Sequence, residues 1–115
     1  MMEAFVLDRT SILVRLGDDE EIYDMMVDMF MNDLENNCVA LSKALANADA
    51  GSVHREVHTI KGLLATFSDE AGAAFAMTLE RQAKAGNIAG MAGDIEALQA
   101  RLREVAGVLR LAGQA

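Results

Sequence analysis

The sequence predicts an all-α fold, an up-down antiparallel four-helix bundle with a short extra helix at its N-terminal end. Its 115 residues include no Pro, no Trp, one Tyr and four Phe. A chain poor in strand-forming residues and rich in Ala, Leu and Met favours helix. Apolar residues also recur at steps of three and four over several long stretches. Because only short connections separate these stretches, consecutive helices must run antiparallel.

The first two predicted helices meet at a glycine turn. Asp8 can cap a short helix that runs to about Leu16, and Leu16-Gly17-Asp18 indicates that this helix stops and another begins. Asp18, with Glu21 three residues later, approximates a capping box for a long second helix that should end at Asn47-Ala48-Asp49. We interpret the methionines and the single cysteine of its apolar stripe as core residues. The predicted stripe consists of Ile22, Met25, Met26, Met29, Phe30, Leu34, Cys38, Leu41 and Leu45.

Three further helices follow along the chain. The third should span about Asp49 to Phe67. The fourth should begin at Ser68-Asp69-Glu70, bury Phe75 and Leu79, and stop near Gly86-Asn87. The last is the most regular, with the spacing of closely packed antiparallel helices. The predicted buried seams are Val53, Val57, Ile60, Leu64 and Phe67 for the third helix, and Ile88, Met91, Ile95, Leu98, Leu102, Val105 and Leu109 for the last.

Charge and cysteine content narrow the classes of function. The chain carries 10 Lys and Arg against 18 Asp and Glu, a formal net charge of −8. The counterion release that drives nucleic-acid binding is therefore absent overall, and neither nucleic acids nor anionic membranes are expected partners. A single cysteine cannot form an internal disulfide, and neither a signal peptide nor a membrane-length apolar run is evident. We expect one domain over residues 1–115, monomeric and cytoplasmic.

The predicted third helix also carries an unusual stripe outside its buried seam. At roughly 100° per residue, His58 points well away from the seam, with Gly62 and Ala65 following at i+4 and i+7 and Lys61 beside them. A glycine inside a helix costs about 1 kcal/mol relative to alanine. A lone surface histidine usually has no function, but this bare stripe beside a histidine and a cation indicates that another molecule approaches closely.

The residues around His58 resemble a known family. The run His58-Thr59-Ile60-Lys61-Gly62 is similar to the His-[Ser/Thr]-[Leu/Ile]-Lys-Gly signature of histidine phosphotransfer (HPt) domains. The resemblance covers nearly the whole chain, because the sequence on both sides is also placed as in that family. The flanking matches are Asp49, Val53 and Arg55 upstream, and Leu79-Glu80 and Ala85-Gly86-Asn87 downstream.

The resemblance implies a role for each residue of the stripe. His58 would be the phosphorylated residue, Lys61 would assist with the charge of the phosphoryl group, and Gly62 would leave room for a receiver domain. Glu80, on the next helix, would hydrogen-bond the other ring nitrogen of the histidine and fix its tautomer. On the residues alone, Glu80 has the alternative of an i+4 pair with Lys84.

The implied function is that of a phosphocarrier without turnover of its own. It would take a phosphoryl group from the aspartyl phosphate of one receiver and pass it to another. The expected partners are response-regulator receiver domains and a hybrid sensor histidine kinase, with no cofactor and no metal in this chain. The receiver would dock on Gly62, Ala65, His54 and Leu63. Leu63 departs from the small residue usual in the family, and either adds to that surface or packs against a neighbouring helix.

Three other functions remain open on the sequence. The bundle could be an adaptor that binds a receiver or kinase without phosphorylation. It could be the phosphoacceptor module of a chemotaxis-type histidine kinase, with ATP held by another domain. His54 and His58, at i and i+4, could hold a transition metal. No third ligand is evident, and no Glu directly follows His54, so metal binding is not expected.

Overall fold

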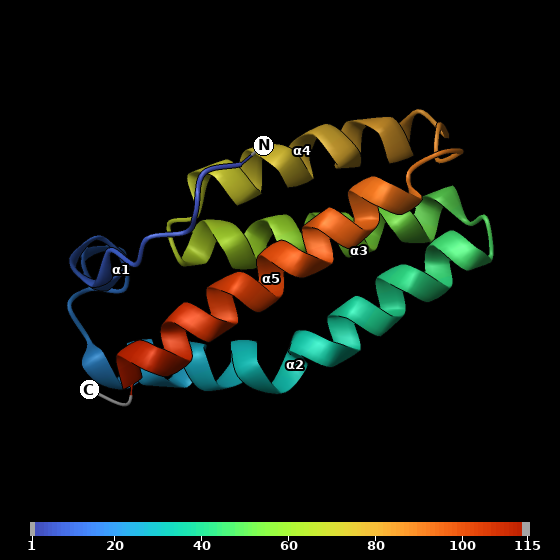
Figure 1. Cartoon of the computed structure of the whole chain (residues 1–115). Helices are drawn as coiled ribbons and strands as arrows, with labels where there is room; N and C mark the ends of the chain where they lie inside the picture. Colours follow the sequence, from blue (N-terminus) through green and yellow to red (C-terminus); the bar gives the residue numbers. More distant parts are fainter. Residues whose placement is uncertain (1, 114–115) are drawn as a thin grey trace.

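The computed structural model describes residues 2–113 and folds them into five helices (Figure 1). No strand occurs within these residues, which confirms the predicted all-α class. The helix boundaries also lie close to those predicted. The helices are α1 (Arg9–Arg15), α2 (Glu20–Ala46), α3 (Ala50–Thr66), α4 (Glu70–Lys84) and α5 (Ala92–Gly113).

Helices α2 to α5 form the predicted antiparallel bundle, and α1 lies at one end of it (Figure 1). The described chain measures 41 × 23 × 22 Å along its principal axes. Helix α5 packs along α2, and the most extensive contact between any two helices joins α3 to α4. The helix that carries His58 is therefore fixed mainly by the helix that carries Glu80.

Aspartate side chains start four of the helices. In each case a carboxylate oxygen accepts a hydrogen bond from a backbone N–H in the first turn, at Asp8, Asp19, Asp49 and Asp69. The prediction that Asp18 caps α2 is wrong, because the cap is Asp19. Gly17 and Asp18 have φ values of 74° and 59°, so both residues complete the turn in left-handed backbone. A cap needs a non-helical, usually extended backbone, which the chain reaches one residue later.

The core lies where α3 and α5 were predicted to bury their seams. All five predicted seam residues of α3 are buried, and so are the predicted residues of α5 from Met91 onward. Phe30 of α2 and Phe67 meet edge to face, with ring centroids 5.2 Å apart. Cys38 is 2% exposed, as expected of a core residue, and burial raises the pKa of its thiol. Phe75, predicted to be buried, is half-buried against this core.

The predicted apolar stripe of α2 is partly wrong in its first half, although Phe30 is buried and Met26 packs against the core as predicted. Ile22, Met25 and Met29 are 39%, 57% and 52% exposed, whereas Tyr23, which was not predicted, is buried. The inward-facing series lies one residue further along the helix, which rotates it by about 100°. Apolar residues occupy two neighbouring faces of this helix, and spacing alone does not tell which of them meets the core.

A buried ion pair that the sequence analysis did not predict joins α4 to α5. Arg101 is 4% exposed and Asp69 2% exposed, and the guanidinium donates two hydrogen bonds to the Asp69 carboxylate, at 2.7 and 2.8 Å. Asp69 is also the cap of α4 and accepts from the backbone N–H of Gly72. One carboxylate therefore starts α4 and neutralises a buried cation.

The same arginine anchors the chain before α1. Arg101 donates to the backbone carbonyl of Glu3 at 2.6 Å, and the N–H of Phe5 donates to Glu104 at 2.7 Å. Phe5 is buried in the core as a result. Arg15, at the end of α1, donates to the carbonyl of Ala65 at 2.7 Å. The N-terminal residues are thus tied both to α5 and to the end of α3.

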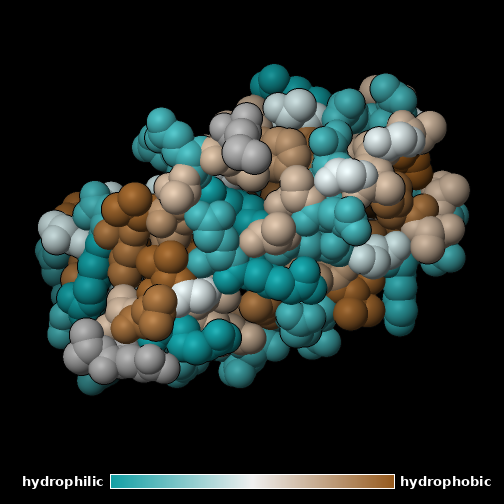
Figure 2. Space-filling model, in the orientation of Figure 1, coloured by the Kyte–Doolittle hydropathy of each residue, from teal (hydrophilic) through white to brown (hydrophobic). Residues whose placement is uncertain are grey.

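The described surface is mixed rather than uniformly polar. In Figure 2, apolar side chains stand among hydrophilic ones near the end of the molecule that α1 and the last turns of α5 occupy. Val6, Val14 and Leu111 are the most exposed large apolar residues, at 80%, 61% and 70%. Within residues 2–113, none of the helices combines the length and the hydrophobicity that a membrane span requires.

Candidate functional site

Helices α3 and α4 together build a site around His58. The apolar seam of α3 faces the core, which leaves His58 on the opposite side with its side chain 64% exposed. His54 and Lys61 lie one turn before and one turn after it on the same face. Glu80 reaches this face from the second half of α4, and its side chain is only 16% exposed.

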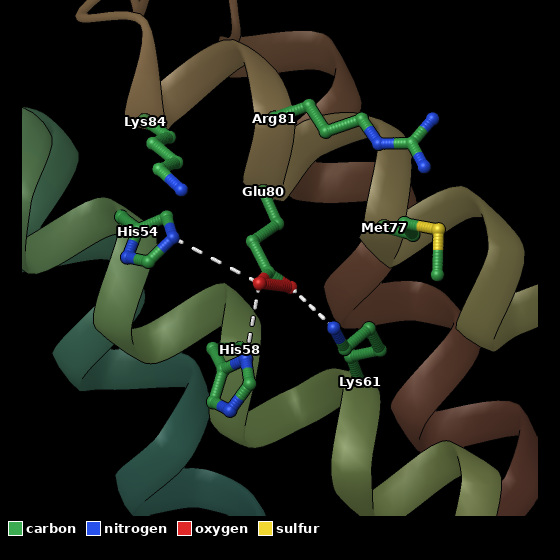
Figure 3. Close-up of a pocket in the computed structure, with 7 residues that line it drawn as sticks. All are labelled: His54, His58, Lys61, Met77, Glu80, Arg81 and Lys84. Atoms are coloured by element: carbon green, nitrogen blue, oxygen red, sulfur yellow. Dashed lines mark hydrogen bonds and ion pairs between the residues drawn. The ribbon is translucent and has the colours of Figure 1, made fainter.

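The carboxylate of Glu80 lies at the centre of the site (Figure 3). Its Oε1 is 3.0 Å from Nδ1 of His58, a hydrogen-bond distance. Its Oε2 is 2.7 Å from Nζ of Lys61. Nε2 of His54 lies 3.8 Å from the same Oε1, too far for a hydrogen bond but within the range of an ion pair. The i+4 pair with Lys84 considered above does not form, since Glu80 turns towards α3 instead.

The contact between Lys61 and Glu80 is the strongest electrostatic feature of the site. Oε2 is buried and makes no hydrogen bond of good geometry within residues 2–113, so the ammonium at 2.7 Å is what compensates its charge. The Lys61 ammonium is the main reason that the pKa of Glu80 lies below its ordinary value. Burial opposes this shift, and the hydrogen bond from His58 adds to it. Glu80 is therefore a carboxylate at neutral pH.

An ionised Glu80 determines which nitrogen of His58 is available. A carboxylate only accepts hydrogen bonds, so Nδ1 of a neutral imidazole must carry the proton that it donates to Oε1. The other nitrogen, Nε2, then keeps its lone pair and faces solvent. The geometry thus presents an oriented nucleophilic nitrogen at the surface of α3.

Three further residues of α4 complete the site, of which the sequence analysis considered only Lys84, as an i+4 partner of Glu80. Met77, Arg81 and Lys84 line a shallow depression together with His58. Figure 3 places Lys84 on the His54 side of this depression, with Arg81 turned away from the Glu80 carboxylate. All three lie within one turn of Glu80, at i−3, i+1 and i+4, so the spacing around Glu80 could have found them.

A second depression adjoins the first and is largely apolar. From α3 it is lined by Lys61, Gly62 and Ala65. Gly62 has open space around it, because a Cβ built there would meet no atom within 4 Å. The bareness of this stripe is therefore not required by packing inside the described chain. The α4 side of the depression is formed by Glu70, Ala73, Ala74, Met77, Thr78 and Arg81.

The four residues expected to form a docking surface do not all come together. Gly62 and Ala65 line the apolar depression, and His54 lines the depression around His58. Leu63 lines neither of these depressions, because it is half-buried against the core. Of the two alternatives for Leu63, the structure therefore shows packing. Among residues 2–113, no group of three His, Cys, Asp or Glu side chains is arranged to hold a metal ion.

Comparison with known proteins identifies the family. The Hpt domain family matches residues 25–108, which is well over half of the chain and includes all of α3 and α4. No curated protein and no solved structure matches the chain. The chain therefore belongs to the Hpt domain family, whose members are phosphocarriers that act by histidine phosphotransfer in two-component phosphorelays.

Proposed function

We propose that this chain is a phosphorelay intermediate that accepts a phosphoryl group on Nε2 of His58 from the aspartyl phosphate of one receiver domain and passes it to another. One observation carries the proposal. His58 is exposed, and its Nδ1 lies 3.0 Å from the partly buried, ionised Glu80. This arrangement orients Nε2 outward as the nucleophile before any partner binds.

The transfer can be written with the groups present. The Nε2 lone pair forms a bond to phosphorus while the bond from phosphorus to the aspartyl oxygen breaks, and the aspartate leaves with the electron pair. The imidazole thereby becomes a phosphorylated imidazolium that keeps its proton on Nδ1. Glu80, through Oε1, is the counter-charge for this cation. Phosphoryl transfer depends mainly on positioning and charge stabilisation, which is what these contacts supply.

The apolar depression beside His58 supports docking of a receiver at this face. Gly62 and Ala65 form its α3 wall, and the open space at Gly62 admits the backbone or side chains of a partner. In the proposed complex His54 lies at the margin of the interface, and Leu63 contributes only the part of its side chain that the core leaves exposed. The interface would be small, as befits a partner that must leave after transfer.

Positive charge around His58 supports an acidic partner. Lys61, Arg81 and Lys84 line the depression of His58 in a protein whose net charge is −8. Arg81 and Lys84 form no ion pair with any residue of the described range. Receiver domains hold their catalytic Mg²⁺ and aspartate in an acidic pocket, so we propose that these two cations face that pocket during transfer. Lys61 pairs with Glu80, so its main role is to fix the position of the Glu80 carboxylate.

We also propose that the protein is a cytoplasmic monomer. In the experiment, it is incubated with phosphorylated receiver domains from its own organism. Transfer is followed by intact mass for the wild type and His58→Gln. We expect an acid-labile, alkali-stable adduct that is lost in the variant, which should fold normally because position 58 is exposed. An adduct that persists in His58→Gln would refute the assignment. Binding of receivers without any adduct would favour the adaptor, and phosphorylation only by an ATP-dependent kinase domain would favour the chemotaxis-type module.

A further inference from the structure

Two imidazoles approach the same carboxylate oxygen in this site. Oε1 of Glu80 is 3.0 Å from Nδ1 of His58 and 3.8 Å from Nε2 of His54. The two rings are nearly parallel, with an angle of 17° between their planes and 6.4 Å between their centroids. Figure 3 shows both histidines on the same side of the carboxylate, opposite Lys61. A single carboxylate oxygen therefore lies within ion-pair range of two imidazole nitrogens.

The rest of Glu80 has little freedom. Its Oε2 is buried and lies 2.7 Å from the Lys61 ammonium, and its side chain is 16% exposed. A rotation of the carboxylate that keeps the contact with Lys61 leaves Oε1 as the oxygen that moves. Its distances to Nδ1 of His58, 3.0 Å, and to Nε2 of His54, 3.8 Å, differ by less than about 1 Å. A small pivot thus moves Oε1 from one ring to the other.

We propose that His54 is a positioning residue that competes with His58 for Oε1 of Glu80, so that protonation of His54 draws Glu80 away from the phosphoacceptor and slows phosphoryl transfer. This inference rests on the function proposed above and adds a regulation of the same site. His54 contacts neither the phosphoryl group nor the receiver aspartate. In the transfer step it acts through Glu80.

The charges around His54 decide which way its protonation acts. On its own helix its neighbour in the site is His58, and from α4 it faces Glu80 and Lys84, whereas Lys61 and Arg81 lie on the other side of the carboxylate (Figure 3). Glu80 is the one anion among them. An imidazolium at position 54 therefore gains by pairing with Oε1, the anion nearest to it in the site. Its side chain is 32% exposed, so protons from solvent can reach it.

When Oε1 turns from His58 to His54, phosphoryl transfer to His58 slows for two reasons. Without the acceptor at Nδ1, the neutral ring is free to place its proton on Nε2, and that tautomer has no lone pair there to attack phosphorus. The imidazolium formed during transfer also loses its nearest counter-charge. The expected penalty is that of one oriented hydrogen bond, about fivefold in rate.

Two variants separate the charge of His54 from its shape. His54→Gln keeps an amide donor but cannot become a cation, and His54→Phe keeps a flat ring without nitrogen. For each protein, the rate of phosphoryl acceptance from one receiver is measured between about pH 6 and about pH 8. Dividing each variant rate by the wild-type rate at the same pH removes the pH dependence of the receiver itself. The ratio at about pH 8 measures the effect of each substitution on docking, and we expect both ratios to rise about fivefold from that value at about pH 6.

A second measurement needs no phosphoryl donor. Ring ¹⁵N NMR of His58 reports which nitrogen carries the proton. The Nδ1–H tautomer should persist to lower pH in both variants than in the wild type. Rate ratios that stay flat with pH, together with unchanged tautomer populations, would overturn the role of His54. If the wild type accepts no phosphoryl group at any pH, the proposed function fails instead, while the NMR titration still decides whether the two rings compete for Glu80.

Discussion

Gly72 is the position at which the smallest substitution should have the largest effect on stability. It lies in the first turn of α4, and a Cβ built there would come within 2.7 Å of Cγ of Asp69 and within 3.1 Å of a methyl carbon of Leu64. Asp69 cannot move freely, because it caps α4 and holds the buried guanidinium of Arg101 with two hydrogen bonds. Gly72→Ala must therefore displace a buried carboxylate.

The size of the stability loss caused by Gly72→Ala follows from the contacts that would be lost. Forcing a methyl group into a packed site costs about 1–3 kcal/mol. A displaced Asp69 also gives up a helix cap worth about 1 kcal/mol and weakens an ion pair whose complete disruption costs about 3–5 kcal/mol when buried. The higher helix propensity of alanine returns about 1 kcal/mol. We expect the free energy of unfolding to fall by about 2–4 kcal/mol.

Urea unfolding followed by far-UV circular dichroism measures this difference, and Gly107→Ala is the matched control. Gly107 lies inside α5, and a Cβ built there would meet no atom within 4 Å, so alanine at this position should stabilise the protein by up to about 1 kcal/mol. A second test repeats Gly72→Ala in an Asp69→Ser background, where the shorter side chain removes the clash and the cost should shrink. A Gly72→Ala protein as stable as the wild type would refute the reasoning.

Three further predictions concern the site. Gly62→Gln should leave stability near that of the wild type, because position 62 is open, but should slow transfer from a receiver; transfer at the normal rate would contradict the close approach. The pKa of Glu80 is lowered. The difference in free energy of unfolding between wild type and Glu80→Gln should therefore not decrease from about pH 8 to about pH 5, and should be lost only as pH falls below about 4. A loss of this difference near neutral pH, measured by urea unfolding, would contradict the prediction. Arg81→Glu and Lys84→Glu should each slow association with a receiver in stopped-flow at low salt and lose that effect at high salt, whereas Arg110→Glu on α5 should not.

Local patterns in the sequence were enough to predict most of the bundle. The seam of α3 contains four buried residues at helical spacing, with Phe67 buried just after the helix ends, and this spacing also placed His58 on the opposite, exposed face. Glu80 was reached only through the resemblance to the family, because its contact with His58 joins two helices. The stripe of α2 was misjudged where Met25 and Met29 offered a second apolar face. Periodicity tells that a helix has apolar faces, but the packing partner selects one of them.

The pair of Asp69 and Arg101 had no signal that could have predicted it. The two residues are 32 positions apart on different helices, and each of them alone is typical of a solvated surface. The cationic side of the site differs, because the i+1 and i+4 spacing from Glu80 points to Arg81 and Lys84 once Glu80 is known. Contacts between elements depend on how helices dock, and spacing within one helix does not encode this.

The hold of Arg101 on Glu3 also bears on where this domain can be cut. The family match covers residues 25–108, yet the guanidinium that neutralises Asp69 also donates to the carbonyl of Glu3, and Phe5 fills part of the core. A fragment trimmed to the matched residues would uncover a buried cation and an apolar cavity at once. For protein engineering, the structural boundary of this bundle therefore includes Glu3 and Phe5, and it lies well before residue 25, where the family match begins.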